Sequence, residues 1–196
     1  RVGFNETNVT VITSDGTLRH FNVRYLRNPM QLTTDLSGEQ SVDKTVHFGS
    51  KLTNEDIKDC ELKIKEDSKQ LKRKICDGNV CLELLGIYVK SDAMFYRLIV
   101  NNRSDINYDV DVLKLYVRDR NKAKRTAAQE VQIDPVSFSN EVKTIRGQNS
   151  EDVIIAVPKQ TISKSKFLSI ELFEKNGGRN LNLKVKSKAI ANARLL

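Results

Sequence analysis

The sequence predicts an all-β protein, an antiparallel β-sandwich of the immunoglobulin-like or a similar type, preceded by a β-hairpin and one amphipathic helix. From Val80 onward, apolar residues recur with a period of two, which is the spacing of a half-buried strand. About seven such runs follow one another, separated by turn-forming residues. Short strands at regular spacing are typical of sandwiches and barrels rather than of βαβ folds.

The first expected element is the hairpin. Val9 and Val11 alternate with polar residues. A turn sequence follows at residues 14–17, and the alternation resumes from Phe21 to Tyr25. A lone hairpin cannot bury its apolar face, so it either packs on the rest of the chain or ends an upstream β domain. We favour the second interpretation and assign residues 1–32 to the end of a truncated N-terminal β domain.

Residues 33–75 are interpreted as a linker followed by a helix. The linker is rich in Thr, Ser, Asp and Gly and has no sustained periodicity. Thr53, with Asp56 three residues later, resembles a helix cap, and the helical spacing ends near Lys74. The apolar residues at helical spacing form a narrow stripe of Ile57, Cys60, Ile64 and Leu71. This stripe predicts a helix of about five turns that lies on a sheet or bridges two domains.

Residues 76–196 form the predicted sandwich domain. Within two of its strands the apolar positions change phase, between Leu84 and Leu85 and between Val112 and Leu113. A β-bulge absorbs such a change by adding one residue to a strand. The expected strands are Leu82–Val89, Met94–Val100, Tyr108–Val117, Ala128–Ile133, Asp152–Val157, Phe167–Glu174 and Leu181–Lys186.

The three cysteines, Cys60, Cys76 and Cys81, are too few for a disulfide scaffold and lack the spacing of a zinc ribbon. We therefore expect no metal and no cofactor. Cys76 and Cys81 bracket the turn sequence 77–80, so they could face each other across a hairpin. Two outcomes stay open: a disulfide in an exported protein, or two small apolar residues with free thiols.

Catalytic groups are scarce. His20 and His47 belong to no nucleophile or metal signature, so we assign both to surface or packing roles. Asp109 and Asp111 alternate with valines and are expected on the solvent face of a strand. The two glycines at residues 177–178 are interpreted as part of a hairpin turn in which glycine supplies a positive φ, not as a phosphate loop. The sequence therefore predicts no catalytic residues and no enzyme.

The chain is basic, with 33 Lys and Arg against 25 Asp and Glu and a net charge of +8. Charges of both signs are interleaved, which favours a solvated surface over a nucleic-acid footprint. Two basic segments are candidate interaction surfaces, and their shortage of aromatic residues favours protein over nucleic acid as the partner. They are a loop with Arg118, Arg120, Lys122, Lys124 and Arg125, and a tail with Arg179, Lys184, Lys186 and Lys188.

Four strings occur in an order that resembles a known family. The match is weakest between Gln31 and Cys76, and residues 7–29 are similar to the last hairpin of the family's N-terminal domain. The closing hairpin has its turn at Glu174, Asn176, Gly177, Gly178 and Arg179. The strings are Leu85–Val89, Asn101–Asp109, Lys124–Glu130 with Pro135, and Phe173–Leu181. Together they resemble the TraN proteins of Bacteroides-type conjugative transposons.

The resemblance implies a periplasmic protein in the outer-membrane-associated part of a conjugation apparatus. TraN proteins look like distant counterparts of the two-domain β-sandwich subunit of type IV secretion core complexes, which assembles in rings with a lipoprotein and a bridging inner-membrane subunit. We therefore expect a non-enzymatic structural subunit with these partners, and a homo-oligomeric ring as a candidate assembly of the full-length protein. Any export signal is expected to have been removed before Arg1.

Two other functions compete with this expectation. One is a periplasmic or extracellular module that binds nucleic acid through the basic loop and tail, for which binding would weaken steeply with salt. The other is a carbohydrate-binding or adhesion domain, because a sandwich fold does not determine function. Direct contact with DNA is disfavoured by the missing aromatic platforms.

Overall fold

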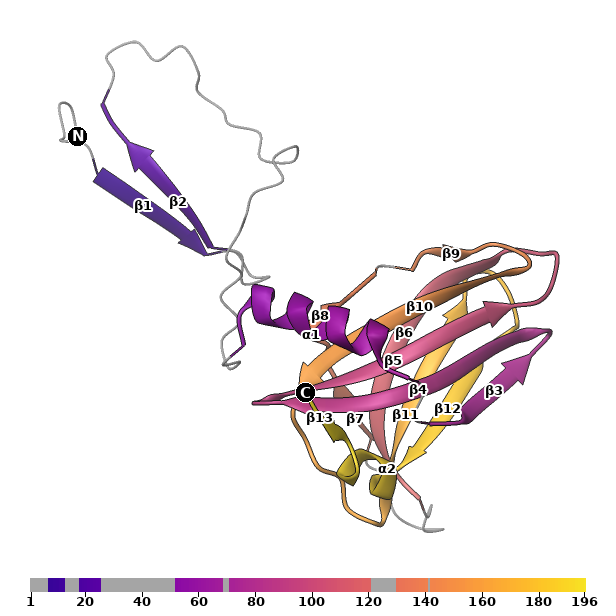
Figure 1. Ribbon diagram of the computed structural model, residues 1–196. Coiled ribbons are helices and arrows are strands. Elements are labelled where there is room, and N and C mark those ends of the chain that lie inside the picture. The colour runs from indigo at the N-terminus through magenta and orange to yellow at the C-terminus, as the bar shows by residue number, and fades with distance from the viewer. Residues whose placement is uncertain (1–6, 13–17, 26–51, 69–70, 121–129, 141) are drawn as a thin grey trace. The chain divides into compact units, whose positions relative to one another are not determined.

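The computed structural model describes residues 7–12, 18–25, 52–68, 71–120, 130–140 and 142–196 (Figure 1). The chain divides into two compact units, residues 1–49 and residues 50–196. In the first unit, β1 (Thr7–Ile12) and β2 (Leu18–Val23) pair in antiparallel register. The predicted hairpin is therefore confirmed.

The second unit contains two sheets that pack face to face, which confirms the all-β sandwich (Figure 1). The first sheet has the order β13-β4-β5-β10-β8, with β3 also beside β4. Its strands are β3 (Arg73–Asp77), β4 (Val80–Lys90), β5 (Ala93–Asn102), β8 (Ser137–Phe138), β10 (Asn149–Pro158) and β13 (Arg194–Leu195).

The second sheet has the order β12-β11-β6-β7, with β9 also beside β6. All described pairings are antiparallel except that of β13 with β4. A short helix, α2 (Ser187–Ala191), follows the last long strand. The strands of this sheet are β6 (Tyr108–Asp119), β7 (Glu130–Ile133), β9 (Thr144–Ile145), β11 (Lys166–Glu174) and β12 (Leu181–Lys186).

Both predicted β-bulges are present. In β4, the pairing with β5 shifts between Leu84 and Gly86, which leaves Leu85 as the extra residue. In β6, the pairing with β11 shifts so that Asp111 is the extra residue. Because of the first bulge, Leu84 and Ile87 both point into the core between the sheets, where each is buried.

The helix α1 (Asn54–Glu66) lies on the outer face of the first sheet. Its N-terminus has the predicted capping box, in which the side chains of Thr53 and Asp56 each accept a hydrogen bond from the other residue's backbone. The stripe of Ile57, Cys60 and Ile64 is buried against a second apolar cluster. That cluster is contributed by the sheet residues Tyr88, Ala93, Phe95, Ile154 and Ala156.

The predicted end of this helix near Lys74 is wrong, because α1 ends at Glu66. Arg97 of β5 caps the helix there, donating to the carbonyl oxygens of Ile64 and Asp67, each at 2.9 Å. The chain after α1 joins the first sheet, because residues 73–77 form β3 and pair with β4. Pairing with a neighbouring strand thus overrides the helical spacing that continued to Leu71.

Two apolar residues of α1 test how firmly the helix is held. Ile64 is fully buried, whereas Leu62 on the same helix is 62% exposed. Ile64→Ala is expected to lower the free energy of unfolding by about 2 to 5 kcal/mol through lost burial and a residual cavity. Leu62→Ala should change it by less than about 0.5 kcal/mol. Chemical denaturation followed by circular dichroism measures both, and equal effects would contradict the packing of α1.

Candidate protein interaction surfaces

Arg179, in the turn between β11 and β12, joins loops at one end of the sandwich. Its guanidinium forms an ion pair with Glu174, with Nε donating to Oε1 at 2.9 Å. It also donates to Ser104 Oγ at 3.0 Å and to the carbonyl oxygen of Asn107 at 2.8 Å. The ring of Tyr108 lies 5.3 Å from the guanidinium carbon, within the range of a cation–π contact. Arg179 is therefore occupied within its own chain.

The glycines of this turn do not have the role expected from the sequence. The positive φ belongs to Asn176, at 55°, and neither Gly177 nor Gly178 adopts one. Gly177 is instead required for space, because a Cβ there would collide with the carboxylate of Glu174. Because Gly177 has no side chain, the carboxylate of Glu174 can reach Arg179. The backbone N–H of Arg179 also donates to this carboxylate, at 3.0 Å.

The junction unites two of the four strings described for the sequence. Arg179 and Glu174 belong to Phe173–Leu181, whereas Ser104, Asn107 and Tyr108 belong to Asn101–Asp109. The two strings are far apart in the chain, yet Arg179 bonds directly to the second one. A further hydrogen bond runs in the opposite direction, because the hydroxyl of Tyr108 donates to the carbonyl oxygen of Arg179 at 2.9 Å.

Arg118 is the centre of a second charged network, on the outer face of the second sheet. It forms ion pairs with Glu130 of β7, at 2.8 Å, and with Glu171 of β11. Glu171 is only 5% exposed and also accepts from Asn182 Nδ2 at 2.6 Å. The hydrogen bonds from Arg118 lower the pKa of Glu130 below its ordinary value. Arg118 thus neutralises carboxylates of its own sheet.

The nine basic residues predicted as contact surfaces divide into three groups. Lys122, Lys124 and Arg125 lie outside the described residues. Arg118 and Arg179 are bound to carboxylates and lie in separate networks. The exposed remainder consists of Arg120, Lys184, Lys186 and Lys188. Of these, Lys184 and Lys186 alternate with buried residues of β12 and lie on its solvent face.

The cysteine pair is joined across the β3–β4 hairpin. Cys76 lies opposite Cys81 in the register, and the structure links them by a disulfide. The connecting residues Gly78 and Asn79 have φ values of 51° and 63°, as a two-residue type I′ turn requires. Cys60 is a free thiol on the buried face of α1, and its burial raises the pKa of the thiol.

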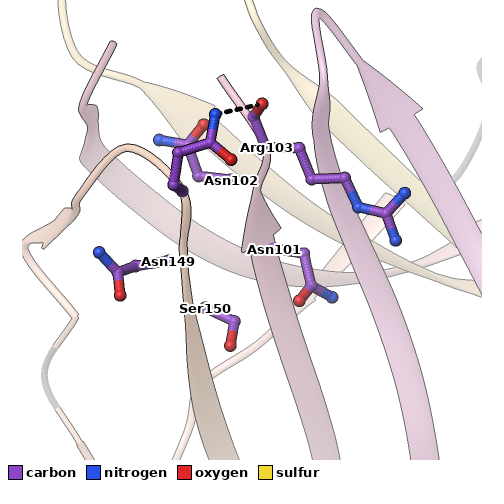
Figure 2. A pocket seen from close by; sticks show the side chains of 6 residues that line it. Asn101, Asn102, Arg103, Asn149 and Ser150 are labelled. Carbon is purple, nitrogen blue, oxygen red and sulfur yellow. Dashed lines mark hydrogen bonds between the residues drawn. The ribbon is translucent and has the colours of Figure 1, made fainter. Parts of the chain in front are cut away.

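A polar pocket lies where β5 ends and β10 begins (Figure 2). Gln148 is one of its lining residues and donates through Nε2 to the carbonyl oxygen of Arg103 at 3.1 Å. The amide groups around the pocket can donate and accept hydrogen bonds, and Arg103 adds a positive charge. The lining residues are Asn101, Asn102, Arg103, Gln148, Asn149 and Ser150.

Among the described residues, no cluster of three or more His, Cys, Asp or Glu side chains could hold a metal ion. Nor is any described helix long and apolar enough to cross a membrane. His20 lies in β2, His47 falls outside the described residues, and Asp109 and Asp111 are exposed as expected for a solvent-facing strand.

Comparison with protein families matches residues 61–195 to the family described as Domain of unknown function (DUF4138). The matched range begins within α1 and includes every described strand of the sandwich. No curated protein and no solved structure matches the chain.

The Arg179 junction predicts a pH dependence of stability. Hydrogen bonds from Arg179 lower the pKa of Glu174 below its ordinary value of 4.5. A carboxyl group with a lowered folded-state pKa stabilises the fold above its unfolded pKa, and this contribution is lost as the pH falls through the folded value. Glu174→Gln is therefore expected to lower the melting temperature at neutral pH and to flatten its decline below pH 4.5.

Thermal unfolding followed by circular dichroism, from about pH 7 to about pH 3, measures this difference. Glu66→Gln, which removes an exposed glutamate at the end of α1, is the matched control and should keep the wild-type profile. Parallel profiles for Glu174→Gln and the wild type would contradict a stabilising role for the ion pair.

Proposed function

The chain belongs to the DUF4138 family, and from this premise we propose that it is a non-enzymatic structural subunit of a conjugative DNA-transfer apparatus, related to type IV secretion systems and similar to TraN proteins. It acts by binding other subunits. The observation that carries the proposal is the contact between the two TraN-like strings through Arg179.

The use of charge in the sandwich supports a structural role. Glu171 and Glu174 are largely buried carboxylates, and each is neutralised by an arginine of the same unit. These groups hold strands and loops in place, so neither carboxylate is available as a general base. A sandwich with fixed loops suits an assembly subunit, because prearranged surfaces lose little entropy when they bind.

The proposed location is the periplasm, in association with the outer membrane. A disulfide between Cys76 and Cys81 supports it, because disulfides persist in oxidising compartments and are rare in the cytosol. The proposed partners are the lipoprotein and the bridging inner-membrane subunit of the apparatus.

A nucleic-acid-binding module is the second candidate function. It is favoured by Lys184 and Lys186, which lie exposed on one face of β12, and by Arg120 at the end of β6. Such binding would weaken steeply as salt increases, because each phosphate contact releases counterions. Binding to single-stranded DNA at low salt, measured with and without Lys184→Gln and Lys186→Gln, distinguishes this function from assembly.

Affinity purification tests the assembly role. The tagged protein is recovered from membranes of a cell that carries the neighbouring conjugation genes. We expect a large complex in which mass spectrometry identifies a lipoprotein and other conjugation subunits, because the proposed function consists of those contacts. Recovery of the protein alone, as a monomer, would overturn the proposal.

Thiol accessibility tests the proposed compartment. In protein recovered from the periplasm, alkylation after denaturation without reductant should modify Cys60 alone, and reduction should expose Cys76 and Cys81. Peptide mass spectrometry reads out each site. Three alkylated cysteines without reductant would contradict export to an oxidising compartment.

The same disulfide predicts a loss of stability. The Cys76→Ser/Cys81→Ser double variant should unfold more easily by roughly 2 kcal/mol, the chain-entropy value for a closed loop of about six residues. Chemical denaturation of the oxidised protein and the variant measures this loss. A variant as stable as the oxidised protein would show that the bond adds nothing to the hairpin.

A further inference from the structure

Three side chains that line the polar pocket lie on one face of the β5–β10 pair. Ser150 of β10 is directly opposite Asn101 of β5 in the register, so these two side chains are neighbours on the same face. Arg103 follows two residues after Asn101, and Figure 2 shows their side chains extending to the same side. The side chain of Asn149 extends to the opposite side (Figure 2). The pocket therefore presents a guanidinium, an amide and a hydroxyl group together.

The polar groups of these three side chains are unused within the part of the chain that the structure describes. The Arg103 guanidinium forms no ion pair there, and the side chains of Asn101 and Ser150 form no hydrogen bonds with described residues. Arg97 and Arg179, in contrast, are each paired with a carboxylate of the same unit. The charge of Arg103 thus stays available to a ligand.

The acceptors next to the pocket already have other donors. The side-chain Nε2 of Gln148 donates to the Asp105 carboxylate at 2.9 Å and to the carbonyl oxygen of Arg103 at 3.1 Å. Asp152, further along β10, forms an ion pair with Arg97 at 2.8 Å. These bonds satisfy the neighbouring acceptors without using the donors of the pocket.

The backbone that carries the three side chains is fixed. The N–H of Arg103 donates to the carbonyl oxygen of Asn79 in the β3–β4 turn at 2.9 Å, and its own carbonyl oxygen is held by Gln148. Asn101 and Ser150 lie within paired strands. Groups that are already held in place lose little entropy when a ligand binds.

The chemistry of these groups selects the ligand. A guanidinium can only donate hydrogen bonds, and an amide and a hydroxyl can each donate as well. Carboxylate and phosphate oxygens accept several hydrogen bonds and match the planar guanidinium. The pocket lining contains no aromatic ring on which a nucleobase could stack. The donors therefore suit an anionic oxygen group.

We propose that this pocket binds an anionic oxygen group, either a carboxylate or a phosphoryl group. Arg103 neutralises the charge of the ligand, and Asn101 and Ser150 donate hydrogen bonds to its oxygens. A carboxylate would come from an acidic side chain or a chain terminus of another protein, and a phosphoryl group from a phosphorylated molecule. The inference does not depend on the proposed function, because all three groups belong to this chain.

Titration of the ¹⁵N-labelled protein followed by NMR tests the site. Sodium phosphate and sodium acetate are added in separate series, and sodium chloride keeps the ionic strength constant, because ionic strength alone changes surface electrostatics. We expect saturable shifts of the amide signals of Asn101, Arg103 and Ser150, with half-saturation at about 10 mM or below. The anion that binds more tightly identifies the source of the group.

Two variants make the test specific. Arg103→Gln should weaken binding of the preferred anion about tenfold or more, because it removes the charged donor, and should leave the melting temperature unchanged. Arg73→Gln is the matched control, since it removes the same charge from an exposed arginine of β3 that is paired opposite Leu84, away from the pocket. It should bind as the wild type does.

Three results would overturn the inference. They are the absence of saturable shifts with both anions, the same shifts in a series of sodium chloride alone, and equal weakening in Arg103→Gln and Arg73→Gln. The last two would show that anions are attracted only by the net positive charge of the chain.

Discussion

The ion pair between Arg179 and Glu174 lies where the turns and loops at one end of the sandwich converge. Its side chains are only 18% and 9% exposed, so removing either one would leave a charge with little access to water. The planar guanidinium also reaches Ser104 and Asn107, which a lysine could not do with the same geometry. Gly177 leaves room for the carboxylate, and Tyr108 contacts the cation.

Two other arginines of this unit, Arg118 and Arg97, also link separate segments through their guanidinium groups. Arg118 joins three strands of the second sheet through Glu130 and Glu171. Arg97 is bonded to Asp152 and caps the C-terminal end of α1, so that it connects the helix to the first sheet. These arginines act as internal links between segments distant in the chain. The net charge of +8 therefore overstates how much positive charge is available to an anionic partner.

The basic surface predicted from composition is accordingly divided. Lys184 and Lys186 remain exposed on β12, whereas Arg118 and Arg179 serve the fold. Composition cannot distinguish these two uses, because a buried and an exposed arginine have the same effect on a charge count.

The sequence by itself determined the features that depend on neighbours in the chain: the hairpin of β1 and β2, the cap at Thr53, the long strands, and the bulge at Leu85. It also indicated a bulge in β6, which lies at Asp111, just before the change of phase between Val112 and Leu113. Alternation and capping are local patterns, so they can be predicted before the fold is known. Tertiary structure alone decided where α1 ends, since that depends on Arg97 and on the pairing of β3 with β4. It also decided the two-residue strands β8, β9 and β13, which are too short for any period, and the meeting of two distant strings at Arg179. These features arise from contacts between segments that are distant in the chain, so the local spacing of residues does not predict them.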